Sequence, residues 1–300
     1  MKVLSLPLAL WAASGLALMA PLSSPAPESP AVFLNHFFVV VNPESYAAMR
    51  ADPYLTGTFA PFEARTTVRA DMTYTGAYWY GERSYFEVFE PPSQGPPGSS
   101  GMALSVDAPR GSAAIKTAWT ESLGAAETSV VTRRTETAEP TWFHITASRS
   151  PVGLRMWLME YDRDFLARFY PNLTAARGIT RAEVLERYVA KIGRLEGRER
   201  TVLRDVTGLR MALDSSDREA LIKHLLPAGW KQRGGTSGLV VLDGPEGVVV
   251  EVEAASATRK GIVEARFSVR GTPAPHAATL GSVRFEVTPS GARLRFANEG

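Results

Sequence analysis

A unit of one strand, one helix and two or three further strands recurs along this chain, and it constrains the fold more than any other feature. The first copy begins with the apolar run 33–41, which ends at Asn42-Pro43 and leads directly into a short helix over 43–50. Proline in the first turn and Glu44 beside it favour a helix N-terminus. Extended, aromatic-rich segments follow up to residue 90. Strands and helices mixed in this order predict an α+β fold.

The unit returns twice, and a fourth copy is started. The expected helices of the second and third copies cover 111–123 and 216–226. The expected strands after the first copy are 102–107, 129–135, 141–147, 154–161, 206–214, 239–242, 248–253, 262–269, 282–288 and 292–296. Because no helix follows the strand at 262–269, we expect the C-terminal half to be an abbreviated repeat.

Residues 162–204 break this rhythm. Thr180 and Glu183 have the spacing of a capping box, and the apolar stripe that follows predicts a helix. We interpret the segment as a helical connector. The chain then divides into 1–31, a signal peptide and Pro/Ser linker; 32–161, paired strand–helix–strand modules; 162–204, the connector; and 205–300, the abbreviated C-terminal half.

The N-terminus has the pattern of a secretory signal peptide. Lys2 precedes an uncharged apolar run up to Ala20, and a Pro/Ser stretch follows. The run is also about long enough to span a bilayer, so an uncleaved membrane anchor is the alternative. Pro7 within the run and the Pro/Ser stretch favour an export signal, and hence a periplasmic or secreted protein.

Composition excludes several classes of partner and chemistry. The 33 basic and 31 acidic residues leave a net charge of +2 with no long run of either sign, so we expect no nucleic-acid partner and no membrane domain beyond the N-terminal segment. The chain has no cysteine, which excludes disulfides and a lipoprotein anchor. It has no Walker loop, nucleophile elbow or His-Glu-x-x-His motif.

The repeated unit resembles the βαβββ modules of the vicinal oxygen chelate superfamily, the glyoxalase and bleomycin-resistance-like proteins. The resemblance rests on 35–41, 85–88 and 101–107 with the helix that follows, and a weaker echo covers 208–230. It implies repeated βαβββ modules that form cupped, mixed and antiparallel sheets. It also implies a divalent metal inside the cup, held by side chains of the first and last strands of each module.

By that resemblance His36, Glu87 and Glu160 match three of the four metal positions, and Gly101 stands where the other ligand is expected. Three protein ligands and an open position can suffice for a catalytic metal. Each residue also has an ordinary structural interpretation. His36 can bond a backbone carbonyl, Glu87 can pair with an arginine such as Arg65, and Glu160, which shares a face with Met156 and Leu158, can pair with a neighbouring arginine.

Tyr74, Tyr78, Tyr80 and Arg65 are candidates for a ligand pocket, although an aromatic cluster of this kind also packs in a core. We therefore expect an exported glyoxalase-like protein that binds a small organic ligand. If it is an enzyme, the resemblance implies metal-dependent lyase, isomerase or dioxygenase chemistry with the metal as Lewis acid. The alternatives are a metal-free binding or sequestering protein, and a structural envelope protein without catalysis.

Overall fold

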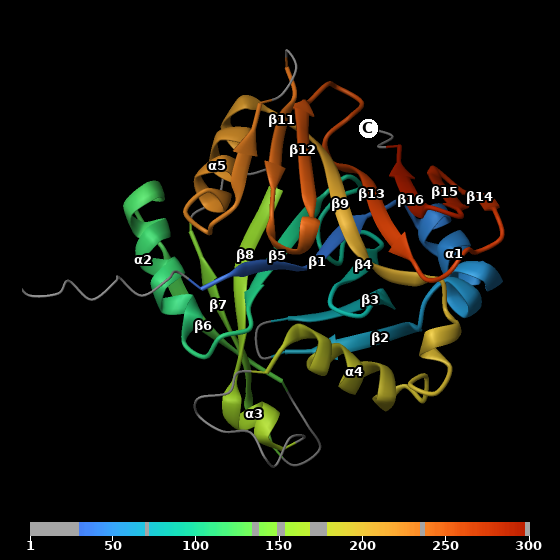
Figure 1. The fold of residues 1–300 in the computed structure, drawn as a ribbon, viewed down its shortest axis with the longest axis horizontal. Coiled ribbons are helices and arrows are strands. Elements are labelled where there is room, and N and C mark those ends of the chain that lie inside the picture. Colours follow the sequence, from blue (N-terminus) through green and yellow to red (C-terminus); the bar gives the residue numbers. More distant parts are fainter. Residues whose placement is uncertain are drawn as a thin grey trace, which may run out of the picture.

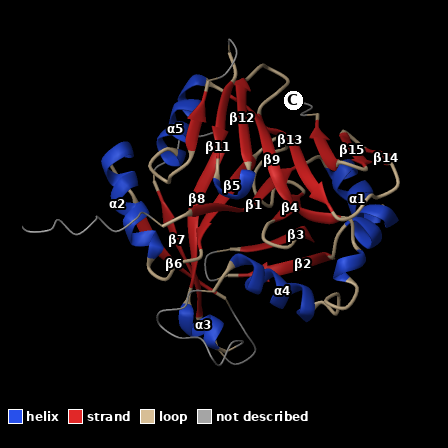
Figure 2. Ribbon diagram, viewed as in Figure 1, coloured by secondary structure: helices blue, strands red, loops and turns tan. Residues whose placement is uncertain are grey.

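A computed structural model describes residues 30–69, 72–133, 138–148, 154–168, 179–234 and 238–297. In this part of the chain the strands form two eight-stranded mixed sheets, one from each half of the sequence (Figure 1, Figure 2). The proposed signal peptide lies outside the described residues. Within the described ranges, no helix has the length and apolar character that crossing a membrane requires.

The first sheet has the strand order β2-β3-β4-β1-β5-β8-β7-β6. Strand β1 is parallel to β4, β5 is parallel to β8, and β1 and β5 pair antiparallel at the centre. The strands are β1 (Val32–Val40), β2 (Phe62–Val68), β3 (Thr73–Tyr80), β4 (Tyr85–Phe89), β5 (Ser100–Val106), β6 (Glu127–Thr132), β7 (Thr141–Ala147) and β8 (Leu154–Tyr161). Two modules thus join along β1 and β5.

The second sheet repeats this order as β10-β11-β12-β9-β13-β16-β15-β14. Strand β9 is parallel to β12 and antiparallel to β13. The strands are β9 (Leu203–Leu213), β10 (Lys231–Arg233), β11 (Val240–Asp243), β12 (Val249–Ala254), β13 (Gly261–Val269), β14 (His276–Leu280), β15 (Val283–Thr288) and β16 (Gly291–Phe296).

Three of the four modules carry their helix. Helix α1 (Pro43–Ala51) is capped by Asn42, whose side chain accepts a hydrogen bond from Ser45 N, and α5 (Ser215–Leu225) is capped in the same way by Asp214. Helix α2 (Gly111–Leu123) packs against α5 through Trp119, whose Nε1 donates to the His224 carbonyl. The connector contributes α3 (Arg163–Ala167) and α4 (Arg181–Lys191), and Thr180 and Glu183 form the expected capping box. One turn of π-helix covers Tyr54–Phe59.

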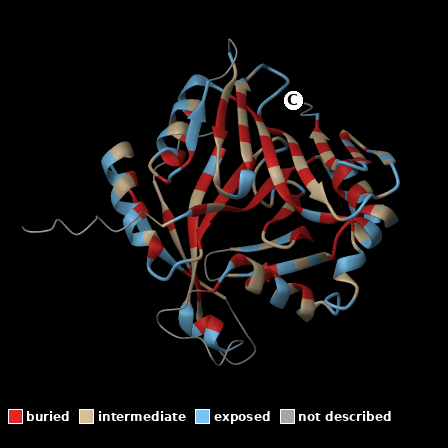
Figure 3. Ribbon diagram, in the orientation of Figure 1, coloured by how far each residue is buried: buried red, intermediate tan, exposed pale blue. Residues whose placement is uncertain are grey.

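The two sheets pack back to back around one hydrophobic core. Phe37 and Phe86 of the first sheet contact Phe267 of the second, with ring centroids 6.5 and 5.3 Å apart. The buried residues therefore concentrate between the sheets, as Figure 3 shows. Because successive side chains of a strand point to opposite faces, His36, Phe38 and Glu87 face away from this core. Each sheet thus presents its other face outward, and each outward face contains a hollow.

The fourth module has no helix of its own, and α1 of the first half packs beside its edge strands (Figure 1). The Ser45 hydroxyl accepts a hydrogen bond from Ser282 N at 2.8 Å. Gly281, with φ +64°, permits this approach, because a Cβ there would lie 2.9 Å from Ser45 Cα. The first half thus supplies a helix that the second half lacks.

The expected α+β fold of repeated βαβββ modules with cupped sheets is confirmed by this architecture. The second half is less abbreviated than expected, since only its second helix is missing. Sequence reasoning missed β10 and β14. Both are short edge strands, and β10 is fully exposed, so neither carries a strong apolar pattern.

Candidate functional site

The outward face of the first sheet contains a hollow of about 230 Å³ that is lined mainly by aromatic rings. His36 and Glu87 lie in it, together with three arginines and Gln94. The rings belong to Phe38, Tyr74, Tyr85, Phe89, Trp142, Phe143 and Trp157. An apolar cavity with a few polar groups is the usual form of a small-molecule site.

His36 is placed by a bulge in β1, between Leu34 and His36, where the register against β5 shifts. Its ring stacks on Tyr85 at 4.4 Å and meets the edge of Trp157 at 5.5 Å. Nδ1 lies 2.8 Å from Asn35 Oδ1. Because that oxygen only accepts, Nδ1 carries the proton and Nε2 keeps a free lone pair. Burial, assisted by the positive charge of Arg65, lowers the pKa of His36 to about 3, so the imidazole is neutral at pH 7.

Glu87 lies on β4, next to β1, with Oε1 3.9 Å from His36 Nε2. Burial raises the pKa of this carboxyl to about 7, although Arg65 and a hydrogen bond from Tyr85 act in the opposite direction. An ion pair is possible at 3.9 Å only if His36 is protonated. Because His36 is neutral, the lone pair of Nε2 faces the carboxyl group of Glu87. The pair therefore shares one site in which a proton can reside on Glu87 near neutral pH.

Arg65 reaches the hollow from β2 and is held by two of the predicted tyrosines. Its guanidinium lies 4.2 Å from the ring centroid of Tyr78 and donates to Tyr80 Oη at 3.3 Å and to Glu63 at 3.1 Å. Tyr78 and Tyr80 are fully buried and support Arg65 from behind, while Tyr74 and Arg65 line the hollow. Of the four predicted pocket residues, two thus line the hollow, and two pack behind it against the Arg65 guanidinium.

Glu160 lies on the opposite face of the sheet. Its carboxylate accepts hydrogen bonds from Arg110 N at 2.5 Å, Ser112 N at 3.1 Å and the Ser112 hydroxyl. It thus closes the N-terminus of α2, where a negative charge is favourable. The structure does not bring it together with His36 and Glu87.

The residues present do not fit a divalent metal. A side chain at Gly101 would overlap the Phe38 ring, which occupies the space of the other expected ligand. Among the described residues no group of three or more histidine, aspartate or glutamate side chains has the arrangement of a metal site. His36 and Glu87 supply only two donors, and the Arg65 cation is close enough to shift the pKa of both.

The connector helix α4 covers one end of this face (Figure 1). Leu185 and Val189 pack on Tyr78, Tyr80 and Tyr85. On the other side, Val184 joins a cluster with Trp142, Phe143 and Met159. The connector therefore covers part of the first cup with apolar side chains.

Several residues of the hollow were missed by sequence reasoning. Trp157, Arg155 and Met159 alternate along β8 with the core residues Met156 and Leu158, so the alternation itself was the available signal. Arg69 and Arg155 add two cations to Arg65, and Arg155 is bonded to Gln94 at 3.0 Å.

The strand order and the cupped first sheet define a protein of paired βαβββ modules with a partly closed aromatic site. The chain belongs to the Family of unknown function (DUF5829), whose family model matches residues 34–296. Among curated proteins none matches it.

Solved structures match the chain at low identity and with TM-scores below 0.5. A hypothetical protein from Staphylococcus aureus is 8% identical with a TM-score of 0.49, covering 83% of this chain and 95% of that one. The Mn(II)-bound glyoxalase from Novosphingobium aromaticivorans is 10% identical with a TM-score of 0.42, covering 91% and 85%. A putative dioxygenase from Bacillus subtilis is 11% identical with a TM-score of 0.29, covering 86% and 82%. At these scores the module topology of the chain itself, and not the neighbours, carries the fold assignment.

Proposed function

We propose that the first hollow binds a small aromatic carboxylic acid without a metal. The observation that carries this proposal is the hollow of about 230 Å³ itself, in which aromatic rings surround the neutral His36 and the buried Glu87. The rings suit an aromatic body, and Arg65, Arg69 and Arg155 suit a carboxylate. Of the alternatives raised by the sequence, the metal-free binding protein is the one that this donor set favours.

The test uses phenylacetate as probe and its neutral analogue 2-phenylethanol for comparison. We expect phenylacetate to raise the Tm of residues 31–300, with the same shift in EDTA, and 2-phenylethanol to raise it less. Trp157→Ala should remove the shift, because it removes one wall of the hollow. Trp230→Phe is the matched control, since Trp230 lies in the core between the sheets. Absence of stabilisation at millimolar phenylacetate, or an equal shift in Trp157→Ala, would contradict the proposal.

A second candidate function follows from Glu87. A carboxyl whose pKa is raised to about 7 is suited to take up and return a proton at neutral pH. We propose that it exchanges an acidic proton beside the carbonyl of a bound aromatic acid. The probe is phenylpyruvate, whose methylene protons exchange with D2O measurably by NMR. Glu87→Gln should abolish the accelerated exchange while phenylacetate still binds. Unchanged exchange in this variant would contradict the catalytic role.

We propose as well that the chain is exported, with the apolar segment after Lys2 as its signal. The support is the order of basic start, apolar run and Pro/Ser stretch in the sequence, and the absence of cysteine is compatible with export. Expression of the full chain in a bacterium, with fractionation and N-terminal sequencing, provides the test. A mature N-terminus between residues 20 and 31 in the exported fraction is expected. An intact N-terminus in the membrane fraction would favour the anchor instead.

A further inference from the structure

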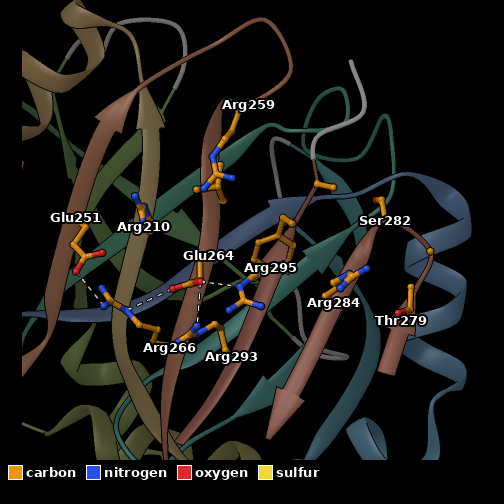
Figure 4. Close-up of a pocket in the computed structure, with 14 residues that line it drawn as sticks. Arg210, Glu251, Arg259, Glu264, Arg266, Thr279, Ser282, Arg284, Arg293 and Arg295 are labelled. Atoms are coloured by element: carbon orange, nitrogen blue, oxygen red, sulfur yellow. Dashed lines mark hydrogen bonds and ion pairs between the residues drawn. The ribbon is translucent and has the colours of Figure 1, made fainter. Parts of the chain in front are cut away.

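The outward face of the second sheet contains a larger hollow, of about 720 Å³, which the proposed function does not use (Figure 4). Most of its charged residues come from neighbouring strands, Arg259 precedes β13, and arginines outnumber acids. They are Arg210, Arg259, Arg266, Arg284, Arg293, Arg295, Glu251 and Glu264. The two cups of the chain thus differ in chemistry, since the first is aromatic and the second is cationic.

Arginines stand directly opposite one another across the strands of this hollow. Arg266 of β13 is in register with Arg293 of β16, and Arg295 of β16 is in register with Arg284 of β15. Like charges in such positions destabilise a sheet. A solvated sheet face commonly carries alternating charges, but an ordinary ladder places opposite charges across from each other. The register also sets Glu264 opposite Arg210 and Arg295, and Glu286 opposite Arg293. The like-charged contacts are therefore confined to the pairs Arg266–Arg293 and Arg284–Arg295, where an anion would offset the repulsion.

Glu253 pairs with Arg210 and Arg259, Glu251 with Arg266, and Glu286 with Arg295. With Glu264 these are four acids against six arginines, so the acids leave two positive charges uncompensated. Glu264 is shared by three of the arginines: its oxygens lie 4.0 Å from Arg266 Nε, 3.6 Å from Arg293 Nε and 3.1 Å from Arg295 Nε. The side chain of Arg284 makes no hydrogen bond or ion pair with any described residue, and no dashed line reaches it in Figure 4. Five N–H donors of that guanidinium are left for a ligand.

The guanidinium of Arg266 lies flat against the sheet because its neighbour on β9 has no side chain. Its register partner on β9 is Gly208, where a Cβ would lie 2.9 Å from Arg266 Nε and 3.0 Å from Nη2. Those two nitrogens are buried without an acceptor among the described residues, while Nη1 donates to Glu251 at 3.1 Å. The guanidinium is thus fixed in place before any ligand arrives, with part of its charge uncompensated.

We propose that this second hollow binds a small polyanion that carries at least two carboxylate or phosphate groups. Guanidinium groups recognise both kinds of oxyanion in a bidentate manner. The arginines of β13, β16 and β15 span roughly 10 Å at the usual strand spacing, which two or more separate charged groups can bridge. Thr279 and Ser282 add hydroxyl groups at the rim of the hollow.

The test measures binding of citrate and of pyrophosphate by titration calorimetry, at a constant ionic strength of about 0.15 M so that diffuse attraction is screened. The diagnostic variant is Arg284→Gln, which breaks no side-chain hydrogen bond or ion pair in the described part of the chain. Arg233→Gln is the matched control, because Arg233 is an exposed arginine of β10 in the same sheet that does not line the hollow.

We expect at least one probe to bind, with affinity lowered about tenfold or more in Arg284→Gln and unchanged in Arg233→Gln. Citrate binding alone identifies a polycarboxylate, pyrophosphate binding alone identifies a phosphorylated ligand, and binding of both identifies charge and geometry as the common requirement. No binding of either probe at millimolar concentration, or equal loss in the two variants, overturns the proposal. Because phenylacetate has a single charge and is tested at the other sheet, either proposal can fail without the other.

Discussion

The carboxylate of Glu87 lies 3.9 Å from Nε2 of His36, and burial displaces the pKa values of the two groups in opposite directions. The histidine loses its proton more readily than in water, and the carboxyl retains its proton more firmly. The two groups thus lie side by side in a buried site that carries little net charge, because His36 is neutral and Glu87 is partly protonated near pH 7. This relationship makes the site suitable for an organic ligand and gives a measurable signature.

The first prediction concerns the pH dependence of stability. From about pH 4.5 to 6.5 the neutral His36 makes the folded state gain stability as pH rises, because only the unfolded chain binds that proton. Glu87 does the opposite over the same range, because the folded chain keeps a proton that the unfolded chain releases. The two effects nearly cancel in the native protein.

Glu87→Gln removes one of the two effects. Its free energy of unfolding should therefore increase by about 2 kcal/mol more than that of the native protein between pH 4.5 and 6.5. Urea denaturation at a series of pH values measures this difference. Glu90→Gln, at an exposed carboxyl just after β4, is the control and should follow the native profile. Parallel profiles for Glu87→Gln and the native protein would refute the compensation.

The second prediction separates Glu160 from the ligand site. Glu160→Ala leaves the backbone N–H groups of Arg110 and Ser112 without their acceptor. The free energy of unfolding should fall by about 1–3 kcal/mol. Phenylacetate affinity should stay the same, because Glu160 faces the core side of the sheet. Glu121→Ala is the control. Glu121 is exposed on α2, the helix that Glu160 caps, and its replacement should change the free energy of unfolding by about 0.5 kcal/mol or less.

The third prediction concerns the contact between Ser45 and Gly281. Alanine at Gly281 is strained by the positive φ and also collides with Ser45. Gly271 has nearly the same φ, +61°, but a Cβ there meets nothing within 4 Å. Gly271→Ala should cost about 1–2 kcal/mol from backbone strain, and Gly281→Ala about 1–3 kcal/mol more from overpacking. Chemical denaturation measures both free energies of unfolding. Equal losses in the two variants would show that the close contact between Gly281 and Ser45 of α1 does not contribute to stability.

The fourth prediction tests whether the two halves unfold together. Asp205 is buried and accepts hydrogen bonds from Arg83 N, Ser84 N and Arg83 Nε, at 2.7, 3.0 and 3.0 Å. Asp205→Ala should lower the free energy of unfolding by about 3 kcal/mol or more. Calorimetry should still show one transition, because the halves share one core. Asp243→Ala, which breaks the exposed pair with Arg233, should cost less than about 1 kcal/mol. Two separate transitions in the native protein would contradict a common core.

Local sequence patterns predicted the modules well, because the helices and strands of a module are set by residues close together in the sequence. The helix at Gly111–Leu123 and the strands Thr141–Ala147 and Leu154–Tyr161 have the expected bounds, since apolar periodicity and capping residues are local signals. Local patterns could not show whether the three predicted metal ligands, His36, Glu87 and Glu160, lie together. Alternation placed Glu160 with Met156 and Leu158, but which face of the sheet becomes the cup depends on how the second sheet packs.

The charged face of the cationic hollow has a signal in the sequence. Glu264 and Arg266, Arg284 and Glu286, and Arg293 and Arg295 each lie two residues apart, which marks one charged face on three strands. Which arginines stand opposite each other depends on strand register and on the bulge between Ile262 and Glu264. Registers are set by pairing between distant segments, so the concentration of positive charge emerges only in the folded chain.

The back-to-back packing of the two sheets gives the molecule two entrances that face away from each other. A ligand in one entrance does not obstruct the other, so both can be occupied in the same copy. Substitutions on either outward face are also free to accumulate independently, as long as the shared interior keeps its packing. Under the two binding proposals, substitutions on one outward face change one specificity and preserve the other.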